Sequence, residues 1–340
     1  MIYRSKAPLR LGLAGGGTDV SPYADLYGGA ILNATISMYA YASIKMRDDQ
    51  KIILNAIDRK ELVELNASDK LPFDGRLDLA KGAYNRLISD FDIKPFGFEL
   101  TTFVEAPPGS GLGSSSTLVV AIIAAFVEVF KLPLGEYDIA HLAYKVERED
   151  LAMAGGRQDQ YAATFGGVNF MEFYEKDKVI VNPLRIKDKY MHELANNLIL
   201  FNTETSRLSH SIIEKQMENV NNKNEASIEA MHQLKEQARM MKEALLRGNI
   251  HEIGEILHYG FQQKKLMAKE ITNSSIDEIY ESALKAGATG GKISGAGGGG
   301  FMTFYAPENN KYKVIEALER FGGRVMPYQF VNHGVISWNV

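Results

Sequence analysis

Alternating glycines followed by hydroxyl side chains mark one stretch of the sequence as a candidate phosphate-binding loop. Residues 107–117 read Pro-Pro-Gly-Ser-Gly-Leu-Gly-Ser-Ser-Ser-Thr. Glycine allows a positive φ and leaves no side chain in the way of a ligand, and successive N–H groups in such a turn can form an anion-binding concavity. Ser114, Ser115 and Ser116 stand where a following helix would add unpaired N–H groups. The stretch therefore predicts a cradle for a polyphosphate.

Two better-known phosphate loops do not fit this stretch. A Walker A loop needs Gly-Lys-Ser/Thr after its spacer, and no lysine occurs between Val104 and Phe130. A dinucleotide fingerprint needs the spacing G-x-G-x-x-G, whereas these glycines stand at positions 109, 111 and 113. A connector that binds nothing is the plainer alternative. So many glycines are costly in chain entropy for a mere connector, which favours phosphate binding.

Two further glycine clusters lie near the ends of the chain. Residues 15–19 read Gly-Gly-Gly-Thr-Asp, and their polar end can hydrogen-bond to hydroxyl groups. Residues 290–300 end in four consecutive glycines, which suggests backbone packed against backbone or against a ligand. A flexible spacer is the alternative for the second cluster. The apolar run that begins at Phe301 fits a core strand better than a linker.

Carboxylates that could do chemistry follow the cradle. A helix is predicted over residues 137–153, and it carries Glu147, Arg148, Glu149 and Asp150. From the residues alone, a solvated helix face is the plainer reading of this charge run, and it is accepted for three of the four residues. Asp159 begins a short predicted helix, where a carboxylate can simply be a cap or a dipole partner.

The elements that must position these groups alternate between the two secondary-structure types. Strands dominate residues 2–103, with two separate runs at 30–36 and 39–46, a hairpin turn at 48–50 and a helix over 79–91. Beyond these, strands are predicted over 96–104, 166–174, 198–202, 301–305, 323–329 and 334–338. Helices are predicted over 118–130, 157–163, two parts of 206–247, 250–268, 275–286 and 312–321, with a linker at 176–190. The pattern predicts an α+β fold.

Composition excludes several classes of protein. The 340 residues allow two domains, and the net charge is 38 − 42 = −4, which argues against nucleic acid or an anionic membrane as the main partner. There is no cysteine, hence no disulfide framework and no thiolate site. No signal peptide or membrane span is apparent, so a cytoplasmic location is expected. The sequence gives no indication of the oligomeric state.

Taken together, the three clusters resemble the GHMP kinase superfamily. Its middle motif, P-x-G-x-G-L-G-S-S, matches Pro107–Ser115; its N-terminal motif matches Ala7–Arg10 and Gly15–Asp19; its C-terminal motif matches Lys292–Gly300. Three ordered motifs over the whole length are far more specific than one short motif. Within the superfamily, residues 4–22 and 155–163 most resemble the D-glycero-D-manno-heptose 7-phosphate kinases.

This resemblance implies a two-domain fold with the active site between the domains. The N-terminal domain, residues 1–185, would be like domain 2 of ribosomal protein S5, and the C-terminal domain, residues 190–340, would be ferredoxin-like.

Relatives such as galactokinase and mevalonate kinase have an acidic-His pair where this chain has Gly16-Gly17. Galactose and mevalonate are therefore less expected as substrates.

The resemblance also implies roles for individual residues. Asp159 would be the catalytic aspartate that orients or deprotonates the anomeric hydroxyl. Arg10 would stabilise charge on the transferring group and favour the ionised carboxylate. Ser115 and Glu147 would bind Mg²⁺. The ATP phosphates would be held by Pro108, Gly109, Ser110, Gly111, Leu112, Gly113, Ser114 and Ser115. Substrate contacts are expected from Gly17, Thr18, Asp19, Gly297, Gly298 and Arg207.

The implied reaction gives a sugar 1-phosphate, here heptose 1,7-bisphosphate, for the synthesis of a nucleotide-activated heptose. The 7-phosphate needs cations of its own, and the candidates are Lys6, Arg157, Arg207 and Lys215; for each the alternative is an exposed surface charge. Other readings are another sugar 1-kinase, for instance one acting on L-fucose, and a non-catalytic sugar sensor on a kinase fold. A nucleic-acid-binding S5-like module is a third, which the net charge disfavours.

Overall fold

One strand of 19 residues, β2 (Gly29–Arg47), is the axis of the larger sheet in this computed structural model, which describes residues 1–205 and 209–340. Its first eight residues are buried, because helices of both halves of the chain pack on them. Its second half alternates between buried and partly exposed residues, as expected for a strand with one open face. The two runs predicted at 30–36 and 39–46 are therefore one continuous strand.

The larger sheet has eight strands in the described residues and combines elements from both ends of the chain. Its main order is β12-β1-β2-β5-β3-β4, and β6 pairs with the first part of β2 and with β7. The strands are β1 (Ile2–Ala14), β3 (Lys51–Ala56), β4 (Glu61–Asn66), β5 (Gly97–Val104), β6 (Val168–Phe173), β7 (Val179–Pro183) and β12 (Ile336–Asn339). The hairpin predicted at 48–50 is wrong, because β5 lies between β2 and β3 and runs parallel to β3.

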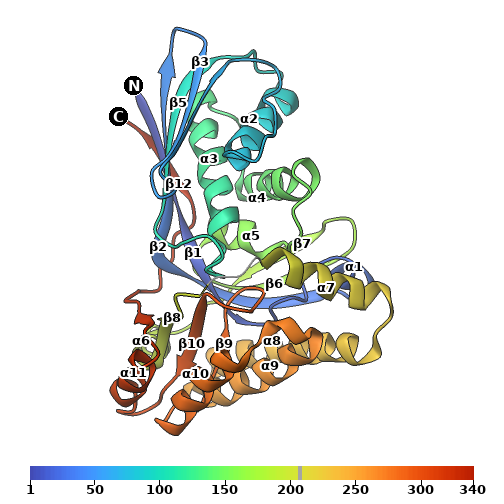
Figure 1. The fold of residues 1–340 in the computed structure, drawn as a ribbon, viewed down its shortest axis with the longest axis vertical. Helices are drawn as coiled ribbons and strands as arrows, with labels where there is room; N and C mark the ends of the chain where they lie inside the picture. The colour runs from blue at the N-terminus through green and yellow to red at the C-terminus, as the bar shows by residue number, and fades with distance from the viewer. Residues whose placement is uncertain (206–208) are drawn as a thin grey trace.

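Helices cover one face of this sheet (Figure 1). They are α2 (Asp78–Asp90), α3 (Ser114–Phe130), α4 (Glu136–Lys145) and α5 (Gln158–Phe165), and a short α1 (Tyr23–Tyr27) follows the first glycine cluster. Helix α3 is apolar nearly all round and lies against β1 and β2 with its middle fully buried. The core of this half is built on α3, which fixes the position of the cradle at its N-terminus.

The helix predicted over 137–153 ends earlier than the sequence indicates. Regular helix stops at Lys145, a π-helical turn follows over Val146–Asp150, and Ala152 has a left-handed φ of 50°. A π-turn adds a residue to the helical turn, and such turns are frequent at functional sites. Here the turn contains Glu147, which is buried at 1% exposure although it stands in a run of charges.

The second half has a four-stranded antiparallel sheet of order β11-β8-β10-β9. Its strands are β8 (Leu198–Asn202), β9 (Gly290–Ile293), β10 (Phe301–Tyr305) and β11 (Arg324–Val325). Its helices are α6 (Asp188–Asn197), α7 (Ser209–Asn221), α8 (Glu225–Arg247), α9 (Ile253–Met267), α10 (Ser274–Lys285) and α11 (Lys311–Glu319), with 3₁₀ turns at Ile250–Glu252 and Lys269–Ile271. The predicted linker 176–190 thus contains β7 and the start of α6. The predicted α+β class is confirmed.

The chain returns to its starting sheet at the end. Strand β12 pairs antiparallel with β1, so the two termini lie side by side (Figure 1). Helix α8 packs on β1 and β2, which joins the two sheets through the buried part of β2. The division after residue 185 proposed from the sequence follows the end of β7, but β12 belongs to the N-terminal sheet. Among the described residues, no helix is long and apolar enough to cross a bilayer.

Candidate active site

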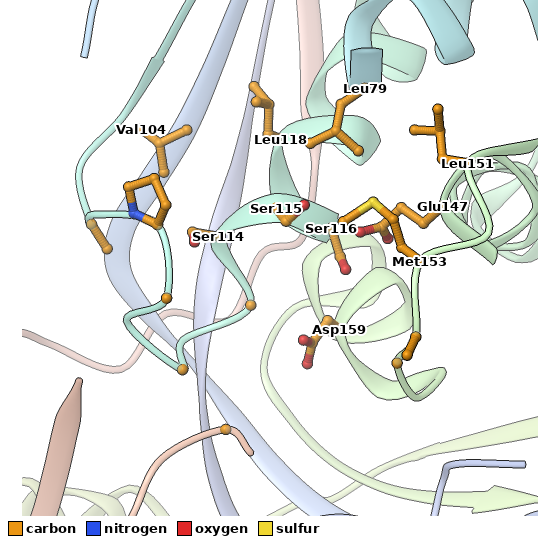
Figure 2. Close-up of a pocket in the computed structure, with 18 of the residues that line it drawn as sticks. Leu79, Val104, Ser114, Ser115, Ser116, Leu118, Glu147, Leu151, Met153 and Asp159 are labelled. Atoms are coloured by element: carbon orange, nitrogen blue, oxygen red, sulfur yellow. The ribbon is translucent and has the colours of Figure 1, made fainter. Parts of the chain in front are cut away.

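A cavity of about 780 Å³ lies where the three glycine clusters meet. It contains apolar side chains at one end, the three serines of the cradle in the middle, and Asp159 beyond them (Figure 2). The apolar end is formed by Leu54, Leu77, Leu79, Leu100, Val104, Leu118, Leu151 and Met153, with Asn55 and Thr102 as polar groups in the same wall. This division suits an elongated ligand with a flat apolar part and a charged part.

The cradle has the backbone conformation predicted from its glycines. Gly109, Gly111 and Gly113 have φ values of 76°, 77° and 79°, and all three line the cavity. Gly113 immediately precedes α3, whose first N–H groups have no partner within the helix. Because the positive end of the helix dipole adds to these donors, the cradle is suited to bind phosphate.

The third glycine cluster packs directly on the cradle. A methyl group at Gly111 would lie 2.6 Å from the Ser294 carbonyl oxygen, and one at Gly300 would lie 2.7 Å from the Ser110 carbonyl oxygen. The Phe301 N–H also donates to the Ser110 carbonyl, at 3.1 Å. The prediction of backbone packed against backbone is confirmed here, and its effect is to hold the cradle against the second sheet.

Asp159 and Arg10 form the polar centre of the cavity. Arg10 Nε and Nη2 lie 2.7 and 2.6 Å from Oδ1 of Asp159, and Arg10 Nη1 donates to the Gly111 carbonyl at 2.5 Å. Arg10 is buried, whereas the Asp159 side chain is 22% exposed and faces the cavity. A methyl group at Gly113 would lie 3.2 Å from Asp159 Oδ2, so only glycine leaves this carboxylate room beside the cradle.

Asp19 holds the loop that leads into α5. Its Oδ2 accepts hydrogen bonds from the N–H groups of Arg157 and Gln158, at 2.8 and 3.0 Å. The Asp19 side chain lines the cavity but is almost completely buried, and this burial raises its pKa. Asp19 therefore fixes the N-terminus of the helix on which Asp159 stands.

A buried glutamine, which the sequence analysis did not single out, connects two parts of the site. Gln160 Nε2 donates to Ser116 Oγ at 3.2 Å and to Glu147 Oε2 at 2.5 Å. Gln160 is fully buried on α5, next in sequence to Asp159. It ties the start of α3 to the π-turn and to the helix of Asp159. Its position directly after the candidate aspartate is the only sequence signal that could have drawn attention to it.

Arg148 is not part of a solvated face. Its guanidinium donates to the carbonyls of Met153 and Gly156, at 3.3 and 3.2 Å, and so shapes the loop over the cavity. The neighbouring carboxylates of Glu149 and Asp150 are ion-paired with Arg86.

Several predicted ligand contacts lie outside the cavity wall. Ser110 and Leu112 are buried behind the cradle, and Thr18 is fully buried, with its hydroxyl bonded to the backbone of Gly15 and Ala30. Gly297 and Gly298 pack against Ile271 behind the wall. By contrast, the wall includes Arg10, Gly17, Asp19, Pro108, Ser114, Ser115, Glu147 and Asp159. Arg207 lies outside the described residues.

The cations predicted for a second phosphate are placed elsewhere. Arg157 is buried between Asp25 and Asp177, at 2.6 and 3.3 Å, and also donates to the Tyr174 carbonyl. Lys6 lies over the ring of Tyr39, and Lys215 is half-exposed and paired with Glu218 at 2.7 Å. None of the three is part of the cavity wall.

Two buried lysines that the sequence analysis did not predict as ligand-binding residues lie near Arg10 instead. Lys264 of α9 lines the cavity, and Lys292 of β9 donates to the Gly12 carbonyl at 2.6 Å. Burial, together with the positive charge of Arg10, lowers the pKa of Lys264 to about 8, and the negative charge of Asp19 opposes this shift. Burial also lowers the pKa of Lys292.

Comparison with known proteins places this site in a family. The profile of the GHMP kinases N terminal domain matches residues 78–167, and that of the GHMP kinases C terminal domain matches residues 241–324. The first covers the cradle, Glu147 and Asp159, and the second covers Lys264, Lys292 and the third glycine cluster.

Similar proteins extend this match to the whole chain. The D-glycero-alpha-D-manno-heptose 7-phosphate kinase of Campylobacter jejuni is 48% identical over 99% of both chains. The crystal structure of a D-glycero-D-manno-heptose 1-phosphate kinase from Bacteroides thetaiotaomicron is 44% identical, with a TM-score of 0.85 over 99% of both chains. A bifunctional fucokinase/GDP-fucose pyrophosphorylase of Arabidopsis thaliana is 26% identical over 91% of this chain and 30% of its own length. The two-domain fold predicted from the sequence is confirmed.

Proposed function

The chain belongs to the GHMP kinases, and from this premise we propose that it transfers the γ-phosphoryl group of ATP to the anomeric hydroxyl of D-glycero-D-manno-heptose 7-phosphate. The products are heptose 1,7-bisphosphate and ADP. The sugar is taken from the similar proteins, which are named as heptose kinases. The roles of individual residues are proposed from the geometry of the cavity.

The observation that carries the proposal is the position of Asp159. This carboxylate is partly exposed to the cavity, lies directly beside Gly113 of the cradle, and is fixed by two nitrogens of Arg10. A hydroxyl group that accepts a phosphoryl group must lie in line with the bond to the leaving oxygen. An acceptor sugar bound against Asp159 would have its hydroxyl next to the terminal phosphate in the cradle.

Asp159 then acts as the general base or orienting group for the acceptor hydroxyl. A positioned base contributes roughly 10²- to 10⁴-fold to the rate of such a transfer. Arg10 contributes by keeping the carboxylate in place and by offering positive charge near the transferring group. Asp19 supports Asp159 indirectly, through the N–H groups at the start of α5.

The nucleotide would lie along the cavity from the apolar end to the cradle. The adenine ring of ATP would contact the wall around Leu79 and Val104. The phosphates would accept hydrogen bonds from the backbone of residues 109–115. This direction leaves the end near Arg10, Asp19 and Asp159 for the acceptor sugar.

The residues between these ends fit a magnesium ion. Ser115 and Glu147 both line the cavity, and Gln160 Oε1 is a buried acceptor without a protein partner close to Glu147. Among the described residues no cluster of three acidic or histidine ligands is present, but Mg²⁺ is usually held by one or two protein ligands, phosphates and water. When bound, it would neutralise charge on the β- and γ-phosphates. Ser115 and Glu147 would hold it, and Gln160 would orient Glu147.

A panel of acceptors tests the proposal. Release of ADP is measured with ATP and Mg²⁺ and with D-glycero-D-manno-heptose 7-phosphate, the unphosphorylated heptose, L-fucose, D-galactose or mevalonate. We expect the highest kcat/KM for the heptose 7-phosphate. A preference for L-fucose would favour the fucokinase relatives instead, and no turnover with any acceptor would contradict the proposed reaction.

A further inference from the structure

The acceptor end of the cavity has more buried basic side chains than carboxylates. Arg10, Lys264 and Lys292 are 4%, 4% and 6% exposed, and they come from β1, α9 and β9. The carboxylates that face them are Asp19 and Asp159. Three buried basic side chains thus lie against two carboxylates.

Both carboxylates are already engaged with other groups. Asp159 pairs with Arg10, and Asp19 accepts two backbone N–H groups. Lys264 and Lys292 have carbonyl partners, Gly295 and Gly12 respectively, and neither forms an ion pair within the part of the chain that the structure describes. Buried charges in proteins are normally paired, because removing an ion from water without a counterion is costly. The arrangement therefore calls for an anion from outside the chain.

The structure also leaves space for such an anion beside Lys264. Gly17, Gln216 and Ala296 line the same cavity as this lysine. A methyl group at Gly16 would lie 3.9 Å from Lys292 Nζ, and one at Gly17 would lie 3.6 Å from Gln216 Oε1 and 2.7 Å from the Met267 methyl group. Gly16 and Gly17 contribute no side chain of their own to this part of the site, and the nearest groups beside Gly17 are the Met267 methyl group and Gln216.

We propose that Lys264 binds a phosphomonoester carried by the acceptor sugar, with Lys292 as a second basic group behind it and the Gly16-Gly17 backbone and Gln216 around it. The inference rests on the proposed function. It assigns the 7-phosphate of the proposed acceptor sugar to one wall of the same cavity. Asp159 and Lys264 both lie near Arg10. We place the reacting hydroxyl at Asp159 and the phosphate end of the sugar at Lys264, since both residues line the same cavity.

Substitution of Lys264 tests the assignment, with its neighbour in sequence as the control. Lys265 follows Lys264 on α9, but it is partly exposed, lies over Phe261 and is 3.8 Å from Asp277. We compare Lys264→Met and Lys265→Met with the wild type, using D-glycero-D-manno-heptose 7-phosphate and the same heptose without its phosphate. The readout is the ratio of kcat/KM for the two acceptors.

Lys264→Met is expected to lower this ratio roughly 10- to 100-fold, the usual value of a charge-assisted hydrogen bond, mainly through KM. Lys265→Met should leave the ratio within a factor of about two, in line with its exposed position. Lys264→Arg, which keeps the charge, should retain part of the preference. An unchanged ratio in Lys264→Met would overturn the assignment while the proposed kinase reaction stands. If the wild type phosphorylates neither heptose, the assignment of Lys264 and the proposed kinase reaction are both contradicted.

Thermal unfolding separates a binding role from a structural one. Lys264→Met removes a buried charge without an ion-pair partner, so the ligand-free variant should melt at the same temperature as the wild type or higher. Heptose 7-phosphate should raise the melting temperature of the wild type and of Lys265→Met, but much less that of Lys264→Met. A lower melting temperature of the free variant, with equal losses of activity on both acceptors, would show that Lys264 is structural and would overturn the inference.

Discussion

Arg10 and Asp159 are 149 residues apart in the chain, yet two guanidinium nitrogens of Arg10 lie 2.7 and 2.6 Å from one carboxylate oxygen of Asp159. The same guanidinium donates to the Gly111 carbonyl of the cradle. One buried side chain thus fixes the distance between the carboxylate and the loop proposed to hold the phosphates. Such fixed placement is the main contribution that a protein makes to phosphoryl transfer.

Asp159→Asn should therefore lower kcat by roughly 10²- to 10⁴-fold, with a much smaller change in KM. The amide is similar in size to the carboxylate and can still accept a hydrogen bond from Arg10, but it cannot take a proton from the acceptor. Steady-state kinetics measure the change, and thermal unfolding checks that the variant is folded. A kcat within a few-fold of the wild type would show that Asp159 is not the base.

Gly113→Ala should impair catalysis beyond its effect on stability. A methyl group there would lie 3.0 Å from Asp159 Cγ, so it would displace the carboxylate. The residue also has a φ of 79°, and alanine at such a position costs about 1 kcal/mol of stability.

Gly322→Ala is the matched control, because Gly322 has a φ of 78° and nothing lies within 4 Å of its added methyl group. Both variants should lose similar stability in denaturant unfolding, but only Gly113→Ala should lose kcat. Equal kcat values in the two variants would contradict the close placement of Asp159 beside the cradle.

Gln160→Met should weaken the response to Mg²⁺. The change removes the donor that Gln160 offers to both Ser116 and Glu147, so the Glu147 carboxylate is no longer oriented. Loss of such a supporting hydrogen bond typically lowers metal affinity by about 10- to 100-fold. The Mg²⁺ concentration at half-maximal activity should rise accordingly, and the free energy of unfolding should fall by about 1–3 kcal/mol.

Gln237→Met controls for the loss of a buried amide. Gln237 is also buried and bonds to the Ile256 carbonyl and the Gly15 N–H, away from Glu147. It should lose comparable stability without a change in the Mg²⁺ dependence. If both variants shifted this dependence equally, Gln160 would have no specific role at the proposed metal site.

The affinity for the phosphorylated acceptor should fall as the pH rises through 8. Burial, together with the positive charge of Arg10, lowers the pKa of Lys264 to about 8, and the negative charge of Asp19 opposes this shift. Lys292 lies nearby, and burial lowers its own pKa well below the usual value. The protonated form binds phosphate, and its population drops from about 90% at pH 7 to about 10% at pH 9, so KM should rise about tenfold over this range.

KM for the unphosphorylated heptose should not follow this profile, and Lys264→Arg should flatten it, because arginine stays charged. The measurement is KM for both acceptors between pH 6.5 and 9.5. Parallel profiles for the two acceptors would contradict the role of Lys264.

Local sequence patterns predicted the structure correctly where one residue type determines the backbone conformation. The alternating glycines around residues 109–113 do have positive φ values, and the apolar run after them is the buried helix α3. Local patterns gave wrong predictions where a segment distant in sequence determines the structure. The residues at 48–50 join two strands that are not neighbours, because β5 comes from residues 97–104. The predicted helix 137–153 gives way to a π-turn that turns Glu147 inward.

Only part of the candidate site could be predicted from the sequence. Arg10, Asp159 and Glu147 were proposed through the resemblance, since their own local patterns indicated a strand residue, a helix cap and a solvated charge, and all three line the cavity. Gln160 and Lys264 were missed, because only the folded chain brings them to the cavity and to its supporting residues. Arg157, a candidate for phosphate binding, lies outside the cavity wall and is paired with Asp25 and Asp177, which could not be foreseen because these partners are distant in sequence.

The position of the transferred phosphate tests the central claim most directly. Heptose 7-phosphate is incubated with ATP, Mg²⁺ and the protein, and the product is examined by ³¹P NMR. The proposed reaction predicts a second phosphomonoester signal, coupled to the anomeric proton of the sugar, that appears as ATP is converted to ADP. A new phosphate on any other carbon, or release of inorganic phosphate alone, would contradict the proposed reaction.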